Sequence, residues 1–321
     1  MPEKHNYYQG FIAALQNKIP QKAALVNTIA DLLVIDKDAV YRRLRGDVNF
    51  SFIEMASIAV KLGISIDSIV GIATMENKPM HMTMAKHINP TDSDYKMFDN
   101  YVYLLSSIKD RHDTLLLEST NTLQNAFYYD YDNITRLYMF SWYLGNNDGT
   151  DTPYHKVTIP EQMRDLQKKV SEYTRHIKNT QYVWDRRMFE RIVENVKYWV
   201  KLRYIKEEDI PPLKNDFFEM LNYLEKLAAR GRYEETGNEI SIYLSDLLLE
   251  TSYSTLKSQN LYLSQFKTFF LNANSSLDED IYDKVSKWIY GLQRKATLIS
   301  VSGEKIRTAF FNTQREILNT L

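Results

Sequence analysis

Over the first 75 residues, apolar side chains recur every three to four positions, which is the period of an amphipathic helix. In the third predicted helix, Val40 and Leu44 lie four apart and face inward, and Asp36 is the expected N-cap. Gly46 stands where a helix commonly ends in a left-handed residue. The pattern therefore predicts a compact helical domain over residues 1–75, with helices at 5–18, 22–33, 37–45, 51–62 and 66–71.

Residues 76–94 carry two prolines and have no helical period, so they are predicted to form a linker. A second domain follows over residues 95–321, beginning with a helically spaced apolar stripe from Phe98 to Leu123. A long basic helical segment is predicted from about 160 to 206, with one buried face made of Trp184, Met188, Ile192, Val196 and Trp199. Further helices are predicted to about residue 230, at 278–295 and at 303–320.

Residues 238–273 show a different pattern. Ile240, Ile242 and Leu244 alternate with polar residues, and a second run near Leu261 is rich in Leu, Tyr and Phe. These segments predict two or three strands in a small antiparallel sheet. The expected fold class is mainly α, with a five-helix N-terminal domain and a larger, mostly helical C-terminal domain that contains this sheet.

The composition, 44% hydrophobic and 25% charged with a net charge of −1 over 321 residues, is that of a globular protein. Any attraction to nucleic acid must therefore come from local clustering of charge. The chain has no cysteine, which excludes disulfides and thiolate zinc sites. The first twenty residues lack the apolar run of a signal peptide, and no stretch approaches a membrane span of about 18 apolar residues. We expect a cytoplasmic protein with no membrane association, metal or cofactor.

The segment DKDAVYRRLRGD, residues 36–47, concentrates charge on one side of the third predicted helix. Its outward residues are Lys37, Asp38, Tyr41, Arg42 and Arg45. Arginine bonds bidentately to guanine or clamps phosphate, and Asp38 would either read a cytosine amino group or pair with Arg42. Asn49 and Ser51, which follow the helix, are expected to contact backbone phosphates. The alternative is a solvated or protein-binding helix face.

Two successive segments, IADLLVIDKDAVYRRLRG and SFIEMASIAVKLGISIDSIV, carry a family signature. The second is the more specific, with an alanine-containing helix, a Leu-Gly-Ile-Ser turn and a short aspartate-containing helix. Through them, residues 25–70 resemble the helix-turn-helix domain of the lambda-repressor/Cro-like transcription regulators. The resemblance covers about the first quarter of the chain. It implies a five-helix DNA-binding domain that usually acts as a dimer.

Three features depart from that family pattern. Val34 stands where glycine is usual, and because a β-branched residue disfavours positive φ, we expect this turn to take another conformation. Val26 occupies the place of a glutamine that often contacts phosphate, and Asn27 or Thr28 is the expected substitute. Residues 21–75 hold six Lys/Arg and six Asp/Glu, so phosphate attraction depends on how the arginines cluster.

The sequence contains no glycine-rich phosphate loop, paired-histidine zinc helix or nucleophile elbow, so we do not expect an enzyme. The expected function is sequence-specific transcription regulation by a homodimer that binds double-stranded DNA. The C-terminal domain would mediate dimerisation and would sense an unidentified small-molecule or protein effector. The alternative is a protein-interaction scaffold whose helix-turn-helix domain binds a protein partner.

Overall fold

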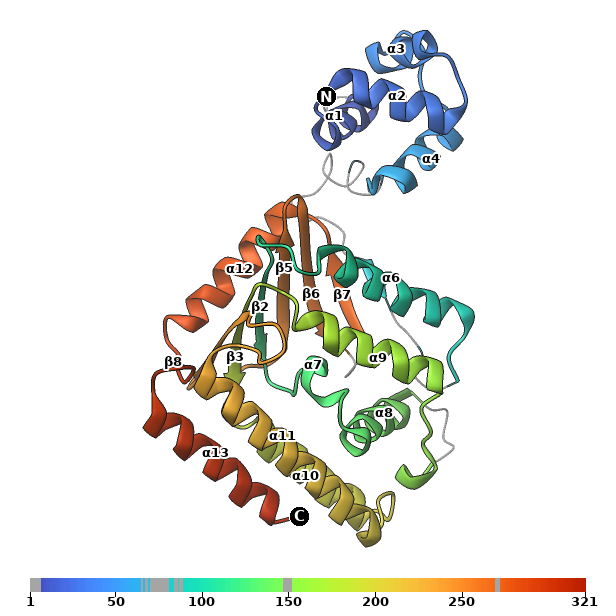
Figure 1. The fold of residues 1–321 in the computed structure, drawn as a ribbon. Coiled ribbons are helices and arrows are strands. Elements are labelled where there is room, and N and C mark those ends of the chain that lie inside the picture. Colours follow the sequence, from blue (N-terminus) through green and yellow to red (C-terminus); the bar gives the residue numbers. More distant parts are fainter. Residues whose placement is uncertain are drawn as a thin grey trace, which may run out of the picture. The chain divides into compact units, whose positions relative to one another are not determined.

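The computed structural model describes residues 7–64, 66, 69, 81–83, 86, 89–146, 152–268 and 272–321. The chain divides into two compact units, Met1–Met80 and His81–Leu321, which are described separately (Figure 1). Strand β1 (His81–Thr83) belongs to the sheet of the second unit, although it lies within the stretch 76–94 that the sequence predicts to be a linker.

The first unit is a set of short helices around one apolar core. Its helices are α1 (Tyr7–Lys18), α2 (Lys22–Leu33), α3 (Lys37–Arg45) and α4 (Phe52–Leu62), which match the sequence prediction to within two residues. The predicted fifth helix over 66–71 lies outside the described residues except at positions 66 and 69. Val40 and Leu44 are buried as expected, in a core shared with Phe11, Ile12, Leu15, Leu25, Val26, Ile29, Ala30, Phe50, Ile58 and Ala59.

Local hydrogen bonds explain where α3 and α4 begin and end. A capping box opens α4, because the Glu54 N–H donates to the Ser51 hydroxyl (3.2 Å) and the Ser51 N–H donates to the Glu54 carboxylate (2.7 Å). Gly46 ends α3 at φ 84°, as the sequence predicts. Asp36 has the extended backbone of an N-cap, but its side chain accepts no capping hydrogen bond, so the predicted cap is wrong in that respect.

The turn between α2 and α3 corrects a further expectation. Val34 has φ 53° and ψ 50°, so the expected departure from the left-handed conformation does not occur. The Val34 N–H donates to the Ala30 carbonyl, and this bond closes the end of α2 in the left-handed geometry that glycine usually supplies. Its side chain is 88% exposed, so no burial offsets a conformational cost of about 1–2 kcal/mol.

The second unit is built on an eight-stranded sheet in the order β1-β7-β6-β5-β2-β3-β4-β8. Three central strands are parallel, namely β2 (Leu115–Thr120), β3 (Asn179–Asp185) and β4 (Glu239–Ser245). The other strands join antiparallel, and they are β5 (Tyr253–Ser258), β6 (Leu261–Thr268), β7 (Asn272–Ser276) and β8 (Thr297–Leu298). The expected mainly α class with a small antiparallel sheet near 238–273 is therefore wrong, because the sheet is large and mixed.

Two central strands lie inside segments that the sequence assigned to helices. β2 falls within the stripe from Phe98 to Leu123, whose helix α6 (Asp92–Ile108) ends seven residues before it. β3 interrupts the segment 160–206, so Trp184 is a strand residue and not part of a helical face. A central parallel strand is buried on both faces and lacks alternation, and a short apolar run of this kind cannot be told from a buried helix by period alone.

Helices cover the two faces of the sheet unequally (Figure 1). α12 (Glu279–Gln293) packs on one face, where Val285 and Ile289 meet Leu117 and Val183. The opposite face carries most of the other helices, namely α6, α7 (Asn125–Tyr128), α8 (Asp132–Asn146), α9 (Glu161–Thr174), α10 (Met188–Lys201), α11 (Ile210–Arg230) and α13 (Glu304–Asn319). None of the described helices combines the length and the apolar character that crossing a lipid bilayer requires.

Candidate nucleic-acid interface

The exposed side of α3 holds the predicted base-reading residues together. Lys37, Asp38, Arg42 and Arg45 are exposed, and Tyr41 is half-buried. Positions 38, 41, 42 and 45 are spaced at i, i+3, i+4 and i+7, so they share one face of a helix nine residues long. The structure therefore presents these side chains as one surface, with the unit's core behind it.

The three arginines of α3 differ in what they contact. Arg43 donates to the Glu54 carboxylate (2.9 Å), and its guanidinium lies 5.8 Å from the centre of the Phe50 ring. Desolvation works against ionisation of Glu54, but hydrogen bonds from the Ser51 N–H and from Arg43 hold the pKa of this carboxyl below its ordinary value. Arg43 therefore fixes α3 to α4 and is not available to a ligand.

Arg45 and Arg42 remain on the surface. Arg45 donates twice to the Asp47 carboxylate, at 2.7 and 2.9 Å, and both side chains are at least half exposed, so water screens the pair and phosphate can replace it. Among the described residues, Arg42 forms no ion pair, so of the two alternatives for Asp38 the pairing with Arg42 is not made. Arg42 is thus the guanidinium best placed to reach a base.

The flanking residues are not equally suited to phosphate. Asn49 and Ser51 are exposed, and although the Ser51 oxygen caps α4, its hydroxyl donates to no acceptor in the described part of the chain and can donate to phosphate. Asn27 is exposed on α2, whereas Thr28 is half-buried and donates to a carbonyl of its own helix (2.9 Å). Asn27 is therefore the better substitute for the family's glutamine.

The start of α2 supplies two candidates that the sequence reading missed. Lys22 and Gln21 are exposed, and the Lys22 ammonium lies 5.7 Å from the centre of the Tyr41 ring. The free N–H groups of a helix N-terminus favour phosphate, so this corner extends the α3 surface. Val26 is buried in the core, which rules it out as a phosphate contact. The sequence signal was the polar pair directly before the first apolar residue of this helix.

Tyr8 anchors the loop after α3. Its hydroxyl donates to the Arg43 carbonyl (2.7 Å) and accepts from the Phe50 N–H (3.2 Å). Burial of the phenol raises the pKa of Tyr8, so it stays neutral and able to donate. Together with Arg43, this contact makes α3 a rigid platform.

A groove of about 850 Å³ lies beside the turn between α2 and α3. It contacts α3 through Lys37, Ala39 and Arg43, and of these only Lys37 is one of the predicted DNA-reading side chains. Asp31 and Asp36 also line it, and carboxylates repel phosphate. The groove therefore meets the nucleic-acid surface only at Lys37.

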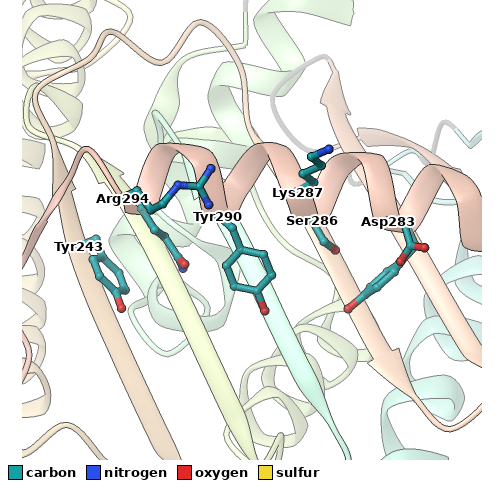
Figure 2. Close-up of a pocket in the computed structure, with 8 residues that line it drawn as sticks. Tyr243, Asp283, Ser286, Lys287, Tyr290 and Arg294 are labelled. Atoms are coloured by element: carbon teal, nitrogen blue, oxygen red, sulfur yellow. The ribbon is translucent and has the colours of Figure 1, made fainter.

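The second unit has an open hollow of about 630 Å³ between α12 and the sheet (Figure 2). Tyr243 and Tyr290 supply aromatic surface to it, and Asp283, Lys287 and Arg294 supply charges of both signs. Beside it, the Gln293 amide donates to Gln181 (3.0 Å), which ties α12 to β3. The mixed charge gives this hollow no preference for an anionic or a cationic ligand.

No protein-family model matches the chain, and comparisons with curated proteins and with solved structures found no match either. The resemblance to the lambda-repressor/Cro-like regulators stays a prediction from the sequence.

Proposed function

We propose that the protein is a sequence-specific DNA-binding transcription regulator of the cytoplasm, in which α3 enters the major groove. The observation that carries the proposal is the exposed Arg42, which forms no ion pair within the described residues, on a short helix that Arg43 joins to α4. A positioned guanidinium on a rigid helix is what bidentate recognition of guanine requires. Lys22, Asn27, Asn49 and Ser51 would hold the backbone phosphates on either side of that helix.

A single helix of nine residues reads few bases, so the proposal includes a homodimer on two half-sites. The second unit is large enough to mediate dimerisation and to respond to an effector. Half-sites would lie about 34–36 Å apart, or a multiple of that distance, because both α3 helices must face the same side of the duplex.

The test is selection of bound duplexes from a random DNA pool by the full chain at near-physiological salt. We expect a palindromic motif that Arg42→Ala loses and Arg232→Ala, which changes an exposed arginine of the second unit, retains. A protein that is folded but selects no motif, with or without a cell extract as a source of effector, would exclude sequence-specific binding.

A protein-docking function for the first unit is the second candidate. The observation in its favour is that Phe52, Ile53 and Val60, all on α4, are large apolar side chains left exposed. DNA binding would weaken steeply with salt, because counterions are released from phosphate. Binding to a protein partner that does not change with salt, without any affinity for duplex DNA, would favour docking.

A further inference from the structure

One part of the sheet face opposite α12 is polar, although Leu116, Tyr182, Leu256 and Leu263 make the neighbouring part of that face apolar. Strand register places Glu118 on β2 opposite Ser254 on β5, and Ser254 opposite Gln265 on β6. Lys267 follows two residues later on the same face. We call these four residues the polar row. All four keep partial exposure, whereas Tyr182, the neighbour of Glu118 on β3, is fully buried.

The two charges of the polar row influence each other without forming an ion pair. Burial raises the pKa of Glu118 to about 7, and the charge of Lys267 acts in the opposite direction. Burial also lowers the pKa of Lys267, whose ammonium donates to the Thr122 hydroxyl (2.9 Å). Within the described part of the chain, no hydrogen bond or ion pair reaches the Glu118 carboxylate. A half-buried carboxylate without a protein partner, on the same sheet face as a half-buried ammonium that it does not pair with, points to a ligand that carries both charges.

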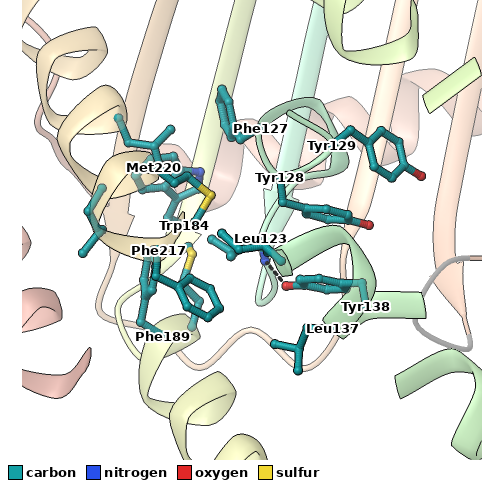
Figure 3. Packing of buried hydrophobic residues seen from close by; sticks show 14 of the residues in the cluster. Leu123, Phe127, Tyr128, Tyr129, Leu137, Tyr138, Trp184, Phe189, Phe217 and Met220 are labelled. Carbon is teal, nitrogen blue, oxygen red and sulfur yellow. Dashed lines mark hydrogen bonds between the residues drawn. The ribbon is translucent and has the colours of Figure 1, made fainter. Parts of the chain in front are cut away.

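Hydroxyl and amide groups surround this part of the sheet. Tyr101 on α6 lies near enough to Glu118 that burial and the carboxylate charge both raise the pKa of the phenol. The hydroxyls of Tyr128 and Tyr129 point to the same side in Figure 3, and burial, the neighbouring phenols and the Glu118 charge together raise the pKa of Tyr128. Gln124, two residues beyond Thr122, is 2% exposed, and neither of its amide atoms finds a partner in the described structure.

The charge pattern selects among ligand classes. A ligand with only acidic groups would satisfy Lys267 and leave Glu118 unpaired, and a simple amine would do the reverse. Since Glu118 and Lys267 lie on one sheet face and form no ion pair with each other in the described chain, a small molecule that carries both charges would pair with each of them. The tyrosine rings add surface on which an ammonium is attracted to aromatic faces.

We propose that the polar row binds a free amino acid in its zwitterionic form, with the ammonium at Glu118 and Tyr101 and the carboxylate at Lys267. Ser254 and Gln265 lie between these two ends and would hydrogen-bond the ligand. This site belongs to the second unit, and its binding is measured without DNA. A protein that binds no amino acid would therefore leave the proposal for α3 unchanged. A protein that selects no DNA motif would likewise leave the proposal for the polar row unchanged.

The experiment is a thermal-unfolding screen of the full chain against the common L-amino acids, followed by calorimetric titration. Tryptophan fluorescence reports on this unit, because Trp142, Trp184, Trp199 and Trp288 all lie in it. We expect at least one amino acid to raise the unfolding temperature saturably. Its carboxamide and its N-acetyl derivative should each bind at least about tenfold more weakly, because each removes one charge. The proposal would be overturned if no amino acid raised the unfolding temperature. It would also be overturned if both derivatives bound as tightly as the free amino acid.

Variants locate the binding. Glu118→Gln and Lys267→Met should each lower the affinity for the amino acid by about tenfold or more. Matched controls on the same sheet are Glu239→Gln, at the exposed start of β4, and Lys257→Met, on the other face of β5, and both should bind as the wild type does. Unchanged affinity in both test variants would refute the site. If a variant fails to fold, the binding of the carboxamide and the N-acetyl derivative to the wild-type protein still tests the proposal.

Discussion

The Arg43 guanidinium donates to the Glu54 carboxylate at 2.9 Å, and this contact joins the helix proposed to enter DNA to the capping box of the next helix. Glu54 thereby serves two helices at once, since its other oxygen accepts from the Ser51 N–H (2.7 Å). The ion pair is largely shielded from water, with each side chain 20% exposed, so it contributes more than a surface pair does.

Arg43→Ala should therefore lower the unfolding free energy of the first unit by about 1–2 kcal/mol, because a charge-assisted hydrogen bond is lost and Glu54 is left partly desolvated. Far-UV circular dichroism of the full chain in denaturant follows the helices of both units, and tryptophan fluorescence follows the second alone. The transition of the first unit is therefore the part of the dichroism change that has no counterpart in fluorescence. Arg45→Ala is the control. Loss of its exposed pair with Asp47 should change the unfolding free energy by less than about 0.5 kcal/mol. An unchanged first transition in Arg43→Ala would show that the contact does not hold α3.

Val34→Gly should stabilise the first unit. Glycine removes the cost of a β-branched residue at φ 53°, and part of the gain is offset by the greater backbone freedom of glycine when unfolded. The expected net gain is about 0.5–1 kcal/mol, measured by the same dichroism experiment. Val48→Gly changes an exposed valine that has no positive φ and should give no gain, so equal effects in the two variants would contradict the argument.

Arg42→Ala should weaken binding to the selected duplex by about 1–3 kcal/mol while changing non-specific binding much less. The physical reason is the loss of a bidentate contact to a base edge. A gel-shift or filter-binding titration at fixed salt measures it, with Arg232→Ala as control. A uniform loss across all sequences would instead make Arg42 a phosphate contact.

The stability of the second unit should depend on Glu118 between about pH 4.5 and pH 7. The pKa is near 7 in the folded state against an ordinary 4.5, so the folded state binds the proton more tightly. The contribution of Glu118 to the unfolding free energy therefore decreases as the pH rises from about 4.5 to about 7, and it does not change further at higher pH. The unfolding free energy of Glu118→Gln should match that of the wild type near pH 5 and exceed it by about 1–2 kcal/mol at pH 8. The expected difference is smaller than the pKa shift alone implies, because the side chain is partly exposed to water.

Tryptophan-monitored unfolding at the two pH values checks this prediction. Glu239→Gln, which changes an exposed carboxylate of the same sheet, should follow the wild type at both. A Glu118→Gln variant that is less stable at pH 8 would mean that Lys267 stabilises the ionised carboxylate more than burial destabilises it.

Local order in the first unit could be read from the sequence. The period that places Val40 and Leu44 inside, the Gly46 end and the polar segment before α4 all act within a few residues, and the helices lie where they predict. The exposed arginines were also visible as a cluster. The sequence did not show which arginine lacks an ion pair among the described residues, because Arg43 contacts Glu54 eleven residues away. Only the packing of both helices against α2 brings these two side chains together.

The second unit was decided by tertiary structure. The apolar segment at β2 is compatible with either a helix or a strand. It forms a strand because β3, which begins 64 residues later at Asn179, and β5, which follows still later, pair with it on either side. That pairing also sets Glu118 opposite Ser254, which no local period reveals. A sequence determines what acts over one or two turns of chain, whereas strand partners and buried charges are chosen by contacts between distant segments that form only in the folded state.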